Sequence, residues 1–124
     1  MNREQKMNAN RHNIQITAEQ DAQNDVNKLL WLVAGLALNV IGLITAYVYE
    51  PSPPAIRLME KSEDEVLFYT AAYKAKARQI QLTSALIGFI ISVILVIILV
   101  VVLFSFIFSA QQEIMREVQR SIQR

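Results

Sequence analysis

The sequence has no cysteine among its 124 residues, and it has only three glycines, three prolines and one histidine. The absence of cysteine excludes disulfide bonds, thiolate metal sites, thiol nucleophiles and S-palmitoylation. The histidine, His12, lies in a polar N-terminal segment, and we interpret it as a solvated residue. No glycine-rich phosphate loop, nucleophile elbow or zinc motif is present. The sequence therefore predicts neither an enzymatic activity nor a cofactor.

Charge is scarce and unevenly placed. Twelve lysines and arginines nearly balance eleven acids, so no basic surface points to a nucleic acid. No charged residue occurs in the 21 residues Leu29–Tyr49 or in the 34 residues Gln79–Gln112. A helix needs about 20 apolar residues to cross a hydrocarbon core of ~30 Å. The sequence thus predicts an all-α integral membrane protein with two transmembrane helices that form a hairpin, and it disfavours a soluble enzyme or a nucleic-acid module.

Turn and capping residues divide the chain between these runs. Pro51, Pro53 and Pro54 end the first helix, because proline lacks the amide donor and disfavours helix in the residue before it. Ser62 and Glu65 have the spacing of a capping box. One helix is then expected from about Glu63 to about Ile122, roughly 90 Å at 1.5 Å per residue. The predicted segments are a partly disordered polar tail (1–28), transmembrane helix 1 (29–49), a proline-rich turn (50–62), a polar amphipathic helix (63–79), transmembrane helix 2 (80–110) and an amphipathic C-terminal helix (111–124).

Small residues mark one face of each predicted span, and small residues let helix backbones approach closely in a bilayer. The predicted packing residues are Gly35, Asn39, Gly42 and Ala46 in the first span, and Ser84, Gly88 and Ser92 in the second. In an antiparallel hairpin, Gly42 and Ala46 lie at the level of Gly88. Asn39 is the strongly polar side chain in mid-span, and we expect its amide to bond Ser92 or the Asn39 of another copy.

Aromatic and basic residues are expected at the membrane interfaces. Trp31 lies at one end of the first span, and Tyr47 and Tyr49 lie at the other. A basic collar precedes the second span, and it can snorkel or bind anionic headgroups at about 1 kcal/mol per charge. The collar residues are Lys74, Lys76 and Arg78. Beyond the span, a row of arginines at intervals of four can contact lipid or a partner; it comprises Arg116, Arg120 and Arg124.

No acid, lysine, arginine or histidine lies in the middle of either span, which excludes proton-driven rotors, voltage sensors and ion-coupled carriers. Residues Val93–Phe104 are apolar on every face, which disfavours a water-filled pore. The positive-inside count ties at five basic residues on each side. With the whole tails counted, the termini are predicted in the cytoplasm. Small size and the lack of cysteine and glycosylation motifs favour a bacterial inner membrane.

These features favour a small membrane protein that acts through interactions. It is expected to be either an accessory subunit of a larger membrane complex or a homo-oligomeric scaffold, with lipid and membrane proteins, including its own copies, as partners. A homo-oligomeric pore is the alternative from another class. A sensor of anionic lipids is the third.

Overall fold

The computed structural model describes residues 1–124, and it confirms the all-α class. It has four α-helices and one short 3₁₀ helix, and no strands. In chain order these are α1 (Arg3–Asp25), α2 (Lys28–Leu38), α3 (Val40–Val48), η1 (Ala55–Arg57) and α4 (Glu63–Ile122). The chain divides into two compact units, Met1–Ile90 and Ile91–Arg124.

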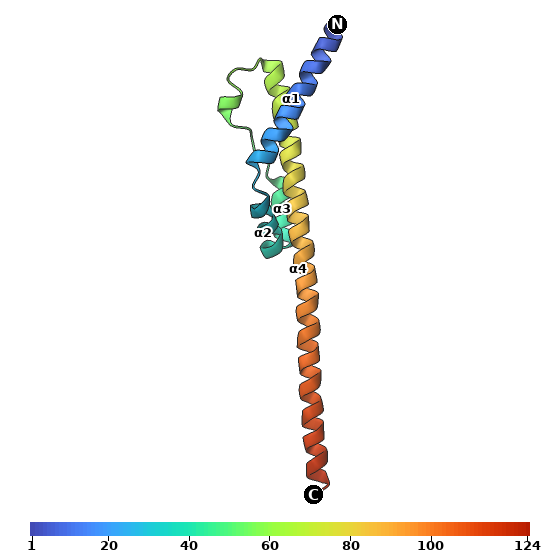
Figure 1. The fold of residues 1–124 in the computed structure, drawn as a ribbon. Coiled ribbons are helices and arrows are strands. Elements are labelled where there is room, and N and C mark those ends of the chain that lie inside the picture. The colour runs from blue at the N-terminus through green and yellow to red at the C-terminus, as the bar shows by residue number, and fades with distance from the viewer. The chain divides into compact units, whose positions relative to one another are not determined.

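Helix α4 is the long apolar helix that the sequence predicts, and it has 60 residues (Figure 1). It begins at Glu63, and the amide of Val66 donates to the Ser62 carbonyl at 2.9 Å as its first turn closes. Three acids in the first turn suit the positive end of the helix dipole. By length and composition, α4 is able to cross a membrane.

Helix α1 begins earlier than expected. The sequence predicts a partly disordered polar tail over residues 1–28, whereas the structure has helix from Arg3 to Asp25. The difference comes from a capping box, in which the Asn2 side chain accepts from backbone amides and the amide of Asn2 donates to Gln5 Oε1 at 3.1 Å. Such reciprocal capping satisfies amide donors that the first turn otherwise leaves without partners.

The segment Leu29–Tyr49, where we predicted one continuous helix, is instead two short helices that pack against each other. They meet at Asn39, whose φ of 52° and ψ of −122° end α2 and start α3. These torsions match the first central position of a type II′ turn, so the chain reverses direction there. At its start, α2 is capped by Asn27, whose Oδ1 accepts from the Leu30 amide at 3.1 Å.

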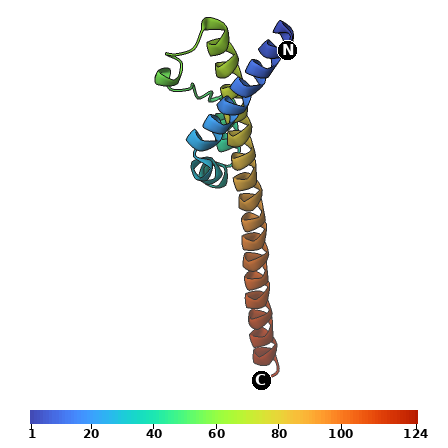
Figure 2. The same ribbon diagram turned by 45° about the horizontal axis from the view of Figure 1, so that its top comes forward.

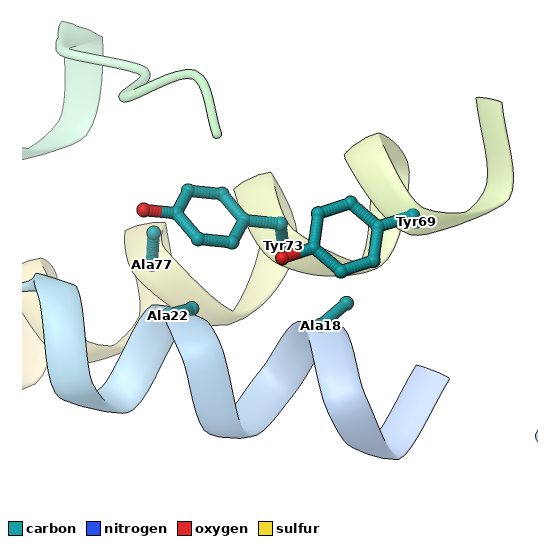
Figure 3. Close-up of a cluster of buried hydrophobic side chains, with 5 residues drawn as sticks. All are labelled: Ala18, Ala22, Tyr69, Tyr73 and Ala77. Atoms are coloured by element: carbon teal, nitrogen blue, oxygen red, sulfur yellow. The ribbon is translucent and has the colours of Figure 1, made fainter. Parts of the chain in front are cut away.

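Within the unit Met1–Ile90, α1 lies beside the first part of α4 and runs in the same direction (Figures 1 and 2). The two helices share a buried cluster of small and aromatic side chains (Figure 3). Its buried members are Ala18, Ala22, Tyr69, Tyr73 and Ala77. The alanines leave room for the tyrosine rings, whose centroids lie 6.2 Å apart. The loop between α3 and α4, which includes η1, returns the chain to the start of α4 (Figure 1).

The unit Ile91–Arg124 is the C-terminal part of α4. Every residue from Val93 to Phe104 is exposed in this unit, and each is a large hydrophobic residue. The apolar surface therefore covers the whole circumference of this helical segment.

Candidate functional site

The three glycines lie where helix backbones approach each other closely. A Cβ at Gly35 would lie 2.0 Å from the Ala85 carbonyl oxygen, and one at Gly88 would lie 2.0 Å from the Leu32 carbonyl oxygen. Helix α2 therefore packs on α4 through two glycines, one on each helix. A Cβ at Gly42 would lie 2.3 Å from the carbonyl oxygen of Ala34, so Gly42 serves the contact between α3 and α2.

This arrangement changes the pairing expected for the small residues. Gly88 lies against Leu32 and Leu36 of α2, whereas we had expected it at the level of Gly42 and Ala46. The break at Asn39 is the reason, because Gly35 and Gly42 then belong to two helices that face each other. Among the remaining predicted packing residues, Ala46, Ser84 and Ser92 are buried, and neither Asn39 nor Ser92 lacks an interaction partner.

The predicted interface aromatics lie together, although we placed them at opposite ends of a span. The rings of Trp31 and Tyr49 are 5.9 Å apart, because the hairpin brings the start of α2 beside the end of α3. Arg78 joins them from α4: its guanidinium donates to the Tyr47 carbonyl at 2.8 and 3.1 Å and lies 3.4 Å from a Glu50 carboxylate oxygen. Its carbon Cζ also lies 4.7 Å from the centre of the Tyr47 ring.

The other predicted surface residues make fewer contacts. Lys74 and Lys76 are half-buried, and Lys76 donates to Gln79 Oε1 at 3.5 Å. All three arginines of the C-terminal row are exposed in the unit Ile91–Arg124. These are Arg116, Arg120 and Arg124.

The densest polar site in the unit Met1–Ile90 is a network at the interface of α1 and α4, which we call the Asp–Tyr–Arg network. Tyr69 donates to Asp21 and Tyr73 donates to Asp25 at 2.8 Å. Arg57, from η1, donates to both carboxylate oxygens of Asp25 at 2.6 and 3.1 Å. A bidentate guanidinium–carboxylate pair of this kind holds both partners in one geometry.

The network shifts the pKa values of its members. The two hydrogen bonds from Arg57 are the main reason that the pKa of Asp25 lies below its ordinary value, and the same pair raises the pKa of Arg57. Burial raises the pKa of Tyr69 and of Tyr73 to about 12, and the hydrogen bonds to Asp21 and Asp25 add to the effect. At neutral pH the two phenols are therefore neutral, Asp25 is ionised and Arg57 is a permanent cation.

Lys61 extends this network along the loop. Its ammonium donates to the Arg57 carbonyl at 2.7 Å and lies 4.7 Å from the centre of the Tyr69 ring. The two Tyr–Asp bonds thus join α4 to α1, and the contacts of Arg57 and Lys61 fix the loop 49–62 to both helices. No group of three or more histidine, cysteine, aspartate or glutamate residues is placed to hold a metal ion.

Sequence reasoning missed this network, although a periodic pattern was present. Asp21 and Asp25 are four residues apart, as are Tyr69 and Tyr73, so each pair lies on one helical face. Ala18 and Ala22 repeat the same interval on α1. The two residues of each Tyr–Asp hydrogen bond are 48 positions apart in the sequence. The aspartate pair and the tyrosine pair therefore meet only because α1 and α4 lie side by side in parallel.

Comparisons of the chain with protein-family models, with curated proteins and with solved structures found no match.

Proposed function

We propose that this protein is a small membrane-embedded component that works by interaction, with α4 as its transmembrane helix and the α2–α3 hairpin as a re-entrant element. The observation that supports this most directly is the apolar surface of α4. From Val93 to Phe104 every side chain is a large hydrophobic group exposed around the helix. Exposure of such a surface to water is unfavourable in free energy. Lipid, or the apolar surface of a partner protein, can cover it without burying polar groups.

The lengths of α2 and α3 favour a re-entrant hairpin rather than a second transmembrane span. Their 11 and 9 residues correspond to about 16 and 14 Å, roughly half of a hydrocarbon core of ~30 Å. The turn at Asn39 is exposed in the structure, and non-helical backbone at membrane depth is tolerated only where protein buries it, so a re-entrant hairpin requires a partner or a second copy that covers this turn. Large apolar side chains on the outside of the hairpin, such as Val33, Ile41 and Ile44, are exposed and suited to lipid.

A re-entrant hairpin also resolves the tie in basic residues. The N-terminus and the loop 49–62 then lie on one side of the membrane with nine of the twelve lysines and arginines, and the C-terminus lies on the other with three. The positive-inside rule favours the cytoplasm for the side with nine. This replaces our expectation of two cytoplasmic termini by one cytoplasmic and one external terminus.

An interaction role fits the polar chemistry as well. The carboxylates of the Asp–Tyr–Arg network are engaged by phenols and a guanidinium, so the network holds the loop in place on α1 and α4. The large hydrophobic surface of α4 leaves lipid, other membrane proteins and further copies of this chain as the natural contacts.

Single-cysteine labelling tests the placement, because the chain has no cysteine of its own. We choose Asn8→Cys in α1, Ser52→Cys in the loop and Ser121→Cys near the end of α4, each probed in sealed vesicles with a membrane-impermeant maleimide. The re-entrant arrangement predicts that positions 8 and 52 label from the same side and position 121 from the other. Two full spans would put positions 8 and 121 together and position 52 opposite. Labelling of all three from one side would refute a membrane crossing.

The interaction role is tested by the mass of the complex extracted in mild detergent. A fixed multiple of the 14.1 kDa chain would identify a homo-oligomeric scaffold. Larger membrane proteins in stoichiometric amount would identify an accessory subunit. A monodisperse monomer without bound protein would contradict the interaction role.

A further inference from the structure

A cavity of about 300 Å³ lies in the unit Met1–Ile90, between the mouth of the α2–α3 hairpin and α4. Its volume is at the lower end of the range for small-molecule sites, about 300–1,000 Å³. Three aromatic residues contribute to its wall: Trp31 from α2, Tyr49 just after α3, and Tyr73 from α4. We call this cavity the aromatic pocket.

Gln81 lines the aromatic pocket and is the observation that points to a ligand. Its side chain is 1% exposed, and its Oε1 atom accepts no hydrogen bond. Buried polar atoms in folded proteins are nearly always bonded, and one that is not calls for an explanation such as an absent ligand. A carbonyl oxygen is satisfied by a group that carries an N–H or O–H donor.

The rest of the lining combines aromatic residues with one carboxylate. The carboxylate of Asp25 is the charged group of the wall, and it already accepts hydrogen bonds from Arg57 and Tyr73. Aromatic faces attract cations through the negative potential above the ring. Because Arg57 already neutralises that carboxylate, it is the three aromatic residues and the carbonyl oxygen without a donor that favour a ligand that is both positively charged and a hydrogen-bond donor.

We propose that the aromatic pocket binds a primary ammonium group, supplied by the headgroup of phosphatidylethanolamine or by a free amine such as ethanolamine. The ammonium lies against the rings and donates to Gln81 Oε1, which is fully buried in the structure and turns toward the cavity to accept this bond. A trimethylammonium group such as that of choline meets the rings equally well, but it has no N–H for the carbonyl. This site goes beyond the proposed function, and only its lipid source rests on the membrane placement.

The experiment uses the full chain in a non-ionic detergent, with the fluorescence of Trp31 as the readout. Trp31 is the single tryptophan of the chain and lines the pocket, so its emission reports occupancy directly. Phosphatidylethanolamine is titrated into the micelles against phosphatidylcholine of the same acyl chains, and ethanolamine is titrated in buffer against choline. We expect a saturable change with the primary amine of at least one pair and a much weaker response to its choline counterpart.

Gln81→Leu removes the acceptor at similar volume and should weaken the apparent affinity about tenfold or more, which corresponds to the loss of one hydrogen bond to a charged group. Gln79→Leu is the matched control, because Gln79 is exposed on the same helix, and it should titrate like wild type. Tyr49→Leu removes one wall of the pocket at a side chain that is 55% exposed, and it should also weaken the response.

Equal titrations by ethanolamine and choline compounds would overturn the proposal, as would wild-type affinity in both Gln81→Leu and Tyr49→Leu. A response to ethanolamine without one to the lipid would assign the site to a soluble amine, and it would leave the membrane placement to the cysteine-labelling experiment. A response to the lipid alone would assign it to the headgroup.

Discussion

Replacing Gly88 with alanine sets two effects of opposite sign against each other. Within a helix, alanine is favoured over glycine by roughly 0.5–1 kcal/mol. The new Cβ, however, would lie 2.0 Å from the Leu32 carbonyl oxygen and 2.9 Å from the Leu36 amide nitrogen. Both are backbone atoms, so no side-chain rotation relieves the clash, and α2 must move away from α4. Overpacking of this kind costs about 1–3 kcal/mol, which leaves a net loss of up to about 2.5 kcal/mol in the free energy of unfolding.

The measurement is unfolding of the full chain in mixed micelles of increasing sodium dodecyl sulfate content, followed by the fluorescence of Trp31 in α2. Thr83→Ala is the control, because Thr83 is exposed on the same helix and its truncation should leave the midpoint nearly unchanged. Gly35→Ala should lower the midpoint as Gly88→Ala does. The double variant should lose less than the sum, because one displacement of α2 relieves both clashes. A Gly88→Ala protein as stable as wild type, or more stable, would refute the close contact of α2 with α4.

Three further predictions concern the turn and the Asp–Tyr–Arg network. Asn39→Gly should preserve the hairpin because glycine readily adopts a φ of 52°. Asn39→Leu should destabilise the hairpin by about 1–2 kcal/mol, because a side chain disfavours positive φ. The measurement is unfolding followed by the fluorescence of Trp31. Asp25→Asn should speed amide hydrogen exchange in the loop 49–62, because the Arg57 guanidinium that fixes the loop loses its ionic partner. Glu117→Gln, at an exposed position, is the control and should leave exchange in the loop unchanged. Equal exchange in both variants would contradict the role of Asp25 in fixing the loop. The stability that Asp25 contributes is present above the unfolded carboxyl pKa and is lost as the pH falls through its lowered folded pKa. Tyr69 and Tyr73 contribute stability below pH ~10 that is lost as the pH rises through about 12, so ultraviolet titration should show phenols that ionise near pH 12 and disappear in the double phenylalanine variant.

Features that depend on neighbouring residues could be predicted from the sequence. The capping-box spacing of Ser62 and Glu65 predicted a helix start near Glu63, and the lack of later prolines predicted one long helix, which the structure has as α4. The glycines were expected at helix contacts because a residue without a side chain lets two backbones approach closely, and in the structure a Cβ at Gly35, Gly42 or Gly88 would clash with the backbone of another helix.

Features that depend on residues far apart in the sequence could not be predicted. The Asp–Tyr–Arg network needs α1 and α4 to align in parallel, and no short-range pattern sets that alignment. The aromatic pocket could not be predicted for the same reason. Gln81 Oε1, which has no hydrogen-bond partner, belongs to a cavity only because the two ends of the hairpin bring Trp31 and Tyr49 beside it.

The division of Leu29–Tyr49 into α2 and α3 shows why apolar length alone does not count membrane spans. Hydropathy is a sum over side chains, and it is the same whether 21 apolar residues form one helix or two half-length helices. The difference lies in the backbone torsions of Asn39, a residue type that enters positive φ more readily than most. The hairpin also needs contacts that a single span does not use, because Gly42 faces Ala34 across the turn. A polar residue in mid-span with glycines on both sides is therefore a reason to test for a re-entrant hairpin before two spans are assumed, and the label at Ser52→Cys makes that test directly.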